Sequence, residues 1–236
     1  MAARWPKVRV WTILRPMIRR NELALRTSRI HEILQPLWPD ERPLLAYRSP
    51  FELVCAVALS AQCTDEQVNK ATPALFELWP DPAGMAAARV EDVEAAIRSL
   101  GFFRTKARHL IEAAKIMEGR FGGSVPSTME ELLELPGVGR KTANLVLSAC
   151  FGQPGIIVDT HVLRSCLRLG IGPKADAADM EKRISELVPR ENWTSFSYAV
   201  NRHGKFVCTA RKPACVAAST RPPCPLLALC PRDGLQ

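Results

Sequence analysis

The chain has 236 residues, of which 47% are hydrophobic. This is enough for one large or two small globular units with a substantial core, and it excludes wholesale disorder. The formal net charge of +8 favours a polyanionic partner. No apolar run is long enough to span a bilayer and no signal peptide is recognisable, so we expect a cytoplasmic protein.

The positive charge is concentrated at the N-terminus. Residues 1–30 hold eight Lys or Arg side chains and one acid, Glu22, and the rest of the chain is nearly neutral. Residues 1–22 are therefore interpreted as a basic arm whose order the sequence leaves open. An acid-poor, Arg-rich start is also typical of organelle transit peptides, and Met17 is an alternative start of translation. Any nucleic-acid footprint on the folded body must then be a local patch.

Beyond the arm, helix-forming segments follow one another between Pro and Gly breakers. A first helix is predicted from Leu23 to Trp38, and Ser49 with Pro50 begins the second. The remaining predicted helices cover residues 66–79, 82–88, 90–100, 104–121, two segments within 127–151, 160–169, 179–187 and 192–206. The apolar run 156–158 is too isolated to indicate a sheet. The sequence therefore predicts an all-α protein.

The most informative stretch is residues 134–144, ELPGVGRKTAN, which joins two of these helices. Pro136 prevents simple continuation of the first helix, and Gly137 and Gly139 allow positive φ. The turn is expected to expose backbone N–H groups at a helix N-terminus beside Arg140 and Lys141, a geometry that suits a phosphate. A plain loop between two core helices is the alternative.

The eight cysteines fall into two groups. Four lie amid apolar helical sequence, where a buried thiol is the default: Cys55, Cys63, Cys150 and Cys166. Four lie in the C-terminal tail with spacings x6, x8 and x5: Cys208, Cys215, Cys224 and Cys230. Four thiolates in such a Pro-rich segment can hold a [4Fe–4S] cluster or a tetrahedral zinc ion.

Four separated motifs, in the right order, resemble those of the helix-hairpin-helix DNA glycosylases of the endonuclease III family. They are LSAQCTD at 59–65, LPGVGRKTAN at 135–144, VDTHVLR at 158–164 and Cys208-x6-Cys215. The resemblance covers about residues 23–230. It implies a bifunctional DNA glycosylase and AP lyase that removes oxidised pyrimidines from duplex DNA in base-excision repair.

The predicted architecture is two helical domains that flank a DNA-binding cleft. A six-helix barrel is expected over residues 43–153 and holds the helix-hairpin-helix at 127–151. Residues 23–42 and 154–236 are expected to form the second domain, with the cluster loop at 208–230.

The catalytic residues that the resemblance implies are Lys141 and Asp159. The helix N-terminus, the adjacent Arg140 and partial burial are expected to favour the neutral amine of Lys141, which would attack the sugar C1′ and leave a Schiff base. Asp159 would stabilise positive charge at C1′ and move a proton. The alternatives are an exposed, phosphate-contacting Lys141 and an Asp159 that only caps a helix.

The remaining site residues are expected to contact DNA. Gln62 resembles the family's plug for the gap left by a flipped base, and Phe102 aligns with its wedge, although Phe102 packed in the core is an equal alternative. His161 is a phosphate contact or a structural residue. The other expected contacts are Gly137, Val138, Gly139, Arg140, Thr142, Arg211 and Lys212.

The family pattern for the tail is C-x6-C-x2-C-x5-C with a [4Fe–4S] cluster. Here the middle spacing is longer by six residues, and residues 216–223 are interpreted as a loop insertion. We expect a [4Fe–4S] cluster in preference to zinc, with a structural role: it would hold Arg211 and Lys212 against the phosphate backbone.

Other functions stay open at this point. A glycosylase for adenine or alkylated bases would share the fold, but Lys141 favours lyase chemistry. A non-catalytic DNA-binding module would need neither Lys141 nor Asp159. The expected partner is double-stranded DNA with damaged pyrimidines or abasic sites, bound by a monomer in the cytoplasm near the nucleoid, with organelle targeting by the arm left open.

Overall fold

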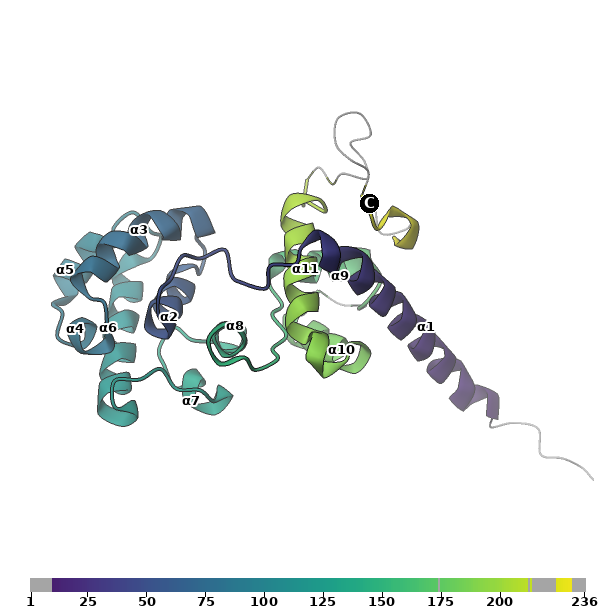
Figure 1. Cartoon of the computed structure of the whole chain (residues 1–236), viewed down its shortest axis with the longest axis horizontal. Helices are drawn as coiled ribbons and strands as arrows, with labels where there is room; N and C mark the ends of the chain where they lie inside the picture. Colours follow the sequence, from purple (N-terminus) through teal and green to yellow (C-terminus); the bar gives the residue numbers. More distant parts are fainter. Residues whose placement is uncertain (1–9, 174, 212, 214–223, 231–236) are drawn as a thin grey trace, which may run out of the picture. The chain divides into compact units, whose positions relative to one another are not determined.

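The computed structural model describes residues 10–173, 175–211, 213 and 224–230, without the side chains of 10–19. Throughout these residues the chain is helical and contains no strand, which confirms the all-α prediction (Figure 1). The fold consists of two compact units. The contiguous unit is Arg42–Ile157, and the discontinuous unit is Met1–Glu41 with Val158–Gln236. The predicted division at 43–153 lies near these bounds, and the predicted barrel and cleft stay predictions.

The contiguous unit is built around α2, whose residues are nearly all buried. Its helices are α2 (Pro50–Leu59), α3 (Asp65–Leu78), α4 (Pro82–Ala86), α5 (Val90–Ala96), α6 (Phe103–Phe121), α7 (Met129–Leu133) and α8 (Arg140–Phe151). Helix α2 packs against α3, α6 and α8, while α4 and α5 cover α6. The core includes Leu53, Leu59, Leu75 and Met117, all fully buried. The central helix is apolar on all sides because neighbours cover all of them.

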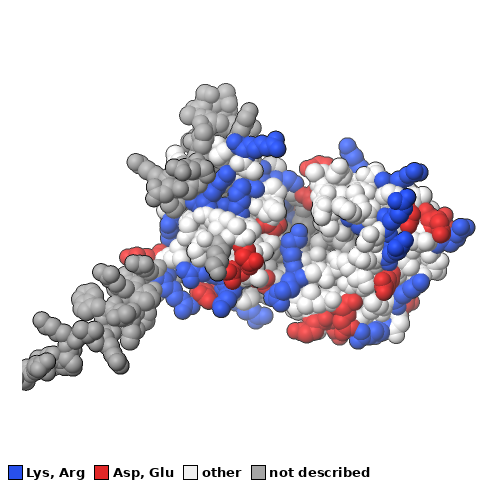
Figure 2. Space-filling model, turned by 180° about the vertical axis from the view of Figure 1, so that it is seen from behind, with Lys and Arg blue, Asp and Glu red and all other residues white. Residues whose placement is uncertain are grey.

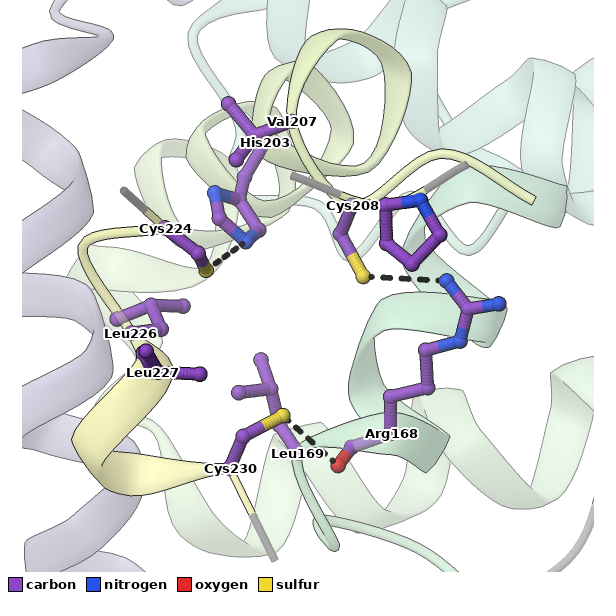
Figure 3. A pocket seen from close by; sticks show the side chains of 10 residues that line it. Arg168, Leu169, His203, Val207, Cys208, Cys224, Leu226, Leu227 and Cys230 are labelled. Carbon is purple, nitrogen blue, oxygen red and sulfur yellow. Dashed lines mark hydrogen bonds between the residues drawn. The ribbon is translucent and has the colours of Figure 1, made fainter. Parts of the chain in front are cut away.

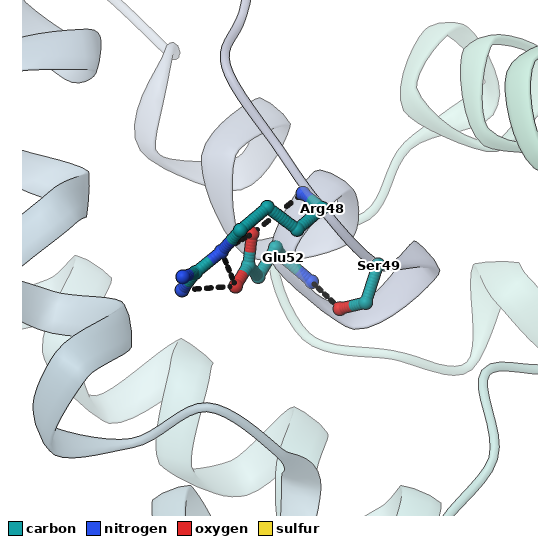
Figure 4. Close-up of polar contacts among 3 residues, drawn as sticks. All are labelled: Arg48, Ser49 and Glu52. Atoms are coloured by element: carbon teal, nitrogen blue, oxygen red, sulfur yellow. Dashed lines mark hydrogen bonds and ion pairs between the residues drawn. The ribbon is translucent and has the colours of Figure 1, made fainter.

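A buried charge fixes the start of α2. The side chain of Glu52 is only 5% exposed and pairs with Arg48 at 2.8 Å (Figure 4). Its carboxylate also accepts the Arg48 backbone N–H at 2.6 Å, and Ser49 Oγ accepts the Glu52 N–H at 3.2 Å. Ser49 is thus the expected N-cap, with Pro50 in the first turn. These contacts set the direction in which α2 leads toward residues 60–64.

The discontinuous unit combines the N-terminal helix with the helices after residue 158. They are α1 (Val10–Leu34), α9 (Thr160–Arg168), α10 (Ala177–Leu187) and α11 (Trp193–Phe206), with short 3-10 turns at Gln35–Leu37, Arg190–Asn192 and Leu227–Leu229. Helix α11 packs against α1 and α9. A Cβ at Gly204 would lie 2.7 Å from the His161 carbonyl oxygen, so this close contact of α11 with α9 requires glycine.

The first helix begins earlier than predicted. It starts at Val10 rather than at about Leu23, so most of the basic arm belongs to α1 and only residues 1–9 of the arm lie outside the described residues. The sequence from Val10 to Leu34 contains no glycine and is rich in Leu, Arg and Ile, residues that tolerate a helix. The interpretation of residues 1–22 as an arm separate from the first helix is therefore wrong from Val10 onward.

Charged side chains are mixed on the surface. Figure 2 shows Lys and Arg interspersed with Asp and Glu on one face, without a uniformly basic area. Within the described part of the chain, no helix is long and apolar enough to cross a membrane.

Candidate functional site

The stretch 134–144 forms a helix-turn-helix hairpin in the contiguous unit. Thr128 caps α7 as expected, and the chain turns through Gly137 at φ +82° into α8. A Cβ at Gly137 would lie 3.3 Å from His109 Nδ1 on α6 and 3.6 Å from Ala58 Cβ on α2. The turn is therefore packed against α2 and α6, and both this packing and the positive φ require glycine.

Helix α8 begins without a side-chain cap, because its N-cap residue is Gly139. A ligand oxygen can take the place of such a cap, as anions do at helix N-termini. Arg140 and Lys141 in the first turn are exposed, whereas Val138 and Thr142 are each 7% exposed. Contacts of Val138 and Thr142 with DNA would thus have to involve the backbone. The expected partial burial of Lys141 is wrong, since a side chain in the first turn of a surface helix points into solvent.

Two exposed residues of this unit have left-handed backbones. Gln62 has φ +56° and Phe102 has φ +58°, and no other non-Gly residue described has positive φ. Phe102 is 66% exposed, which overturns the alternative that it packs in the core. Residues other than glycine adopt this conformation at an energetic cost, and such strain is concentrated at functional sites. The two residues expected to enter DNA are those at which the backbone is strained.

Asp159 is held by three donors in the discontinuous unit. Its Oδ1 accepts the backbone N–H groups of His161 and Val162 at 3.0 and 2.8 Å, so Asp159 is the N-cap of α9. Its Oδ2 accepts a hydrogen bond from Asn201 Nδ2 on α11 at 2.8 Å. The carboxylate is half-buried, and these three hydrogen bonds fix its orientation.

The ring of His161 contacts a neighbouring side chain on its own helix. Its Nδ1 lies 3.2 Å from Nη2 of Arg164, which also donates to the Gly204 carbonyl at 2.7 Å. Arg164 Nε reaches the Cys208 carbonyl at 3.2 Å. Arg164 therefore connects α9 to α11 and to the start of the cysteine-containing tail, and this favours the structural alternative for His161.

Three of the four tail cysteines line one pocket. Cys208, Cys224 and Cys230 surround it together with apolar side chains of Leu169, Val207, Leu226 and Leu227 (Figure 3). Cys215 and Lys212 lie outside the described residues, and Arg211 is exposed. Among the described side chains, no three His, Cys, Asp or Glu are grouped closely enough to hold a single metal ion. In a polynuclear cluster each thiolate binds its own iron, so cysteines distributed around a pocket fit such a group.

The pocket also contains donors to sulfur. Arg168 Nη1 lies 3.5 Å from Cys208 Sγ, and the same guanidinium donates to the carbonyls of Thr209 and Ala210 at 2.8 and 3.1 Å. His203 Nε2 lies 3.8 Å from Cys224 Sγ, and burial lowers the pKa of His203 to about 4. Arg168 thus joins α9 to the start of the cysteine-containing tail at the edge of the pocket.

The four cysteines outside the C-terminal tail were all expected to be buried, and only two of them are. Cys55 and Cys166 are buried, and burial raises the pKa of the Cys166 thiol to about 12. Cys63 and Cys150 are only half-buried. Cys63 Sγ accepts a hydrogen bond from Lys106 Nζ at 3.1 Å. The default of a buried thiol is wrong for these two.

Several residues that organise the site were missed from sequence: Lys106, Arg164, Arg168, Asn201 and His203. Asn201 and His203 lie inside the amphipathic pattern of 193–206, where a polar residue on the buried side is the available signal. Lys141, Gln62, Phe102 and the hairpin belong to the contiguous unit. Asp159, His161, Arg211 and the three described tail cysteines belong to the discontinuous unit.

The all-helical fold, the glycine hairpin of one unit and the capped aspartate of the other are typical of a helix-hairpin-helix protein of the DNA-repair type. The sequence model described as "HhH-GPD superfamily base excision DNA repair protein" matches residues 55–190. The chain belongs to this superfamily.

Individual relatives agree. Endonuclease III of Synechocystis sp. is 43% identical over 221 residues, which cover 93% of this chain and 97% of the relative. Endonuclease III of Bacillus subtilis is 42% identical, covering 84% and 88%. A solved structure of a trapped endonuclease III–DNA covalent intermediate is 40% identical, with a TM-score of 0.82 and coverage of 89% and 96%. These similarities place the chain among the DNA glycosylases and AP lyases of base excision repair.

Proposed function

We propose that this protein removes oxidised pyrimidines from duplex DNA and then cleaves the abasic strand, with Lys141 as the nucleophile. The observation that carries the proposal is an exposed lysine in the first turn of α8, directly after a glycine turn without a side-chain cap. The turn offers backbone N–H groups to a phosphate, and Lys141, two residues after the N-cap Gly139, would then lie near the DNA backbone. A covalent intermediate with DNA has been trapped in the related endonuclease III.

The chemistry requires the amine of Lys141 to be neutral when it attacks. Its lone pair forms a bond to C1′ as the bond from C1′ to the base breaks, and the departing base takes a proton. The nitrogen lone pair then forms the C=N bond as the C1′–O4′ bond breaks and O4′ takes up a proton, which gives a Schiff base between Nζ and C1′. This iminium acidifies the C2′–H, so that removal of that proton expels the 3′ phosphate by β-elimination. Each bond formed is matched by one broken, and no external oxidant is needed.

Asp159 would stabilise the positive charge that develops at C1′ and accept or return the proton. Its three hydrogen bonds keep the carboxylate in one orientation, so no side-chain ordering is required during the reaction. The N-cap role and the catalytic role are compatible, because a cap is what holds the carboxylate in place.

Access to the base would depend on Gln62 and Phe102. A base in a duplex must be flipped out, and the gap must be filled. Both residues are exposed and both occupy strained backbone positions at loop tips of the contiguous unit. We assign Gln62 to the gap and Phe102 to insertion beside the opposite base, where an aromatic ring can stack.

The four tail cysteines Cys208, Cys215, Cys224 and Cys230 are proposed to hold a [4Fe–4S] cluster. The pocket fits, since three thiols and the Arg168 guanidinium surround it with apolar side chains. The cluster, when bound, would bring the tail together and so present Arg211 and Lys212 to the phosphate backbone. The chain's own contribution is the attachment of this tail to α9 through Arg164 and Arg168.

The test of the lyase is borohydride trapping on duplexes that carry thymine glycol or an abasic site. Wild-type protein should give a covalent adduct, and Lys141→Gln should give none. Lys115→Gln removes an exposed lysine of α6 with no proposed role and serves as the matched control. Absence of an adduct from folded wild-type protein would refute the mechanism. Excision of adenine or an alkylated base but not of thymine glycol would point to the alternative base preferences.

The cofactor is tested by metal and sulfide analysis. The purified protein should contain iron and acid-labile sulfide, and Cys224→Ser and Cys230→Ser should lose both. Bound zinc without iron would overturn the choice of metal.

We also infer that the protein acts as a monomer. We infer that it is located in the cytoplasm, near the nucleoid, because its target is chromosomal DNA. Sedimentation with and without a lesion duplex checks the monomer.

A further inference from the structure

The two strained loops of the contiguous unit are connected by one half-buried contact. Lys106 Nζ donates to Cys63 Sγ at 3.1 Å, and Cys63 directly follows Gln62. Lys106 lies one turn into α6, and its backbone N–H donates to the Phe102 carbonyl at 3.1 Å. Each partner of this contact is therefore adjacent to one of the two residues with a left-handed backbone.

Lys106 is unusual for its burial. It is 7% exposed, although a lysine side chain is almost never fully buried without a partner. Its side chain cannot serve as a phosphate contact from such a position. Within the described part of the chain, Cys63 Sγ is the one acceptor that Nζ has. Burial of a lysine amine with a single acceptor costs free energy, so this contact is more than a way of filling space in the core.

The Cys63 loop is otherwise held at its two ends. Ser60 Oγ donates to the Val57 carbonyl at 2.8 Å, and Thr64 forms a capping box with Gln67 at the start of α3. The loop between them carries exposed Ala61 and Gln62. Within the loop, Cys63 donates its backbone N–H to the Ser60 carbonyl at 3.1 Å and packs against the core. The contact from Lys106 adds a lateral polar support, and it comes from the helix that follows the Phe102 turn.

We propose that Lys106 and Cys63 are positioning residues that set the spacing between Gln62 and Phe102. This spacing would match the two side chains to the gap that a flipped base leaves in a duplex. The proposal rests on the proposed function, because Gln62 and Phe102 are taken as the residues that enter DNA. It predicts that the contact matters when an opposite strand is present and a gap must be filled. It is irrelevant on a single strand, where no base pair has to be separated.

The test compares two substrates of one sequence: a duplex with thymine glycol opposite 2-aminopurine, and a single strand with an abasic site. Cys63→Ala and Lys106→Met should slow excision from the duplex by about tenfold, the size of effect expected for coupled neighbours. Both should also reduce the rise in 2-aminopurine fluorescence on binding. Borohydride trapping on the single strand should change by less than about twofold, since the Lys141 chemistry is untouched.

The matched control is Cys63→Ser, which keeps a hydrogen-bond acceptor at a half-buried position and should retain most of the duplex activity. The double variant should be no slower than Lys106→Met alone, because both changes remove one interaction. Equal losses on both substrates, or a wild-type rate and fluorescence in both variants, would overturn the inference. If wild-type protein forms no adduct on either substrate, the proposed function fails, and the 2-aminopurine signal on binding still tests the contact.

Discussion

Asn201 Nδ2 donates a 2.8 Å hydrogen bond to Asp159 Oδ2, so a residue of α11 orients a carboxylate at the start of α9. The other carboxylate oxygen is occupied by the N–H groups of the α9 first turn. Asp159 therefore has two separable roles. One oxygen stabilises a helix, and the orientation of the whole group supports the proposed chemistry.

Asp159→Asn should separate these roles. Asparagine caps a helix about as well as aspartate, and the Asn201 amide can turn so that its oxygen accepts from the new N–H₂ group, so the free energy of unfolding should change by no more than about 0.5 kcal/mol. The amide carries no charge to stabilise C1′, and single-turnover excision should fall by about 100-fold. Asp159→Ala should lose activity and also about 1 kcal/mol of stability. Urea unfolding with single-turnover kinetics checks both. Equal activity of Asp159→Asn and wild type would remove Asp159 from the chemistry.

Asn201→Ala should release the orientation of Asp159 without removing its charge. We expect the excision rate at saturating enzyme to fall by about 10- to 100-fold, because one charge-assisted hydrogen bond contributes about 1.5–3 kcal/mol. The dissociation constant for the lesion duplex should be unchanged, since Asn201 is assigned no DNA contact. Loss of affinity with an unaltered rate would show instead that Asn201 contacts DNA.

Most helices could be predicted because their ends are encoded locally. Ser49, Thr64, Thr128 and Asp159 all cap the helices that their sequence positions indicate. The start of the first helix was mispredicted because the basic, Pro-containing segment before Leu23 was interpreted as a separate arm, whereas the helix formers of residues 10–22 continue α1. A helix that begins with a side-chain cap could be located from local sequence, and the start of α1 could not.

Side-chain partners over long sequence separations could not be predicted in this way. Lys106 meets Cys63 and Asn201 meets Asp159 only because helices distant in sequence pack together. Their polar types were visible, but nothing local specifies which partner each one finds. The exposure of Lys141 was also missed, because burial of a first-turn residue depends on what covers the helix end.

The buried Glu52 predicts a stability effect at the start of α2. Glu52→Gln keeps the size of the side chain but weakens the hydrogen bonds to Arg48, and it should lower the free energy of unfolding by about 1–3 kcal/mol. Urea denaturation followed by circular dichroism measures this. Glu112→Gln, at an exposed position of α6, is the matched control and should change little. A neutral Glu52→Gln would mean that the pair is dispensable.

His31 predicts a pH dependence of stability. Burial is the main cause that lowers its pKa, and Ser195 Oγ lies 2.9 Å from its Nε2. The unfolded chain therefore binds more protons than the folded one as the pH falls through about 6.5, and stability decreases in that range. His31→Gln should lose less stability than wild type between pH 7.5 and 5.5 in urea titrations. An identical pH dependence in both proteins would show that His31 does not contribute.

The two hairpin glycines should differ in what their substitution costs. Gly137→Ala places a Cβ at positive φ and 3.3 Å from His109 Nδ1, so it should destabilise the protein by about 1–2 kcal/mol and weaken DNA binding as the turn shifts. Gly139 has φ −101°, and an added Cβ would have no neighbour within 4 Å. Gly139→Ala should therefore leave the unfolding free energy within about 0.5 kcal/mol of wild type.

If a phosphate closely approaches the N-terminus of α8, the same Gly139→Ala methyl group should obstruct it and weaken binding of a lesion duplex about tenfold. Thermal unfolding and fluorescence anisotropy on the two variants separate stability from affinity. Normal affinity in Gly139→Ala would place the phosphate elsewhere on the hairpin. A loss of affinity at undiminished stability would identify the N-cap of α8 as the phosphate site. This N-cap, Gly139, directly precedes Arg140 and lies two residues before Lys141.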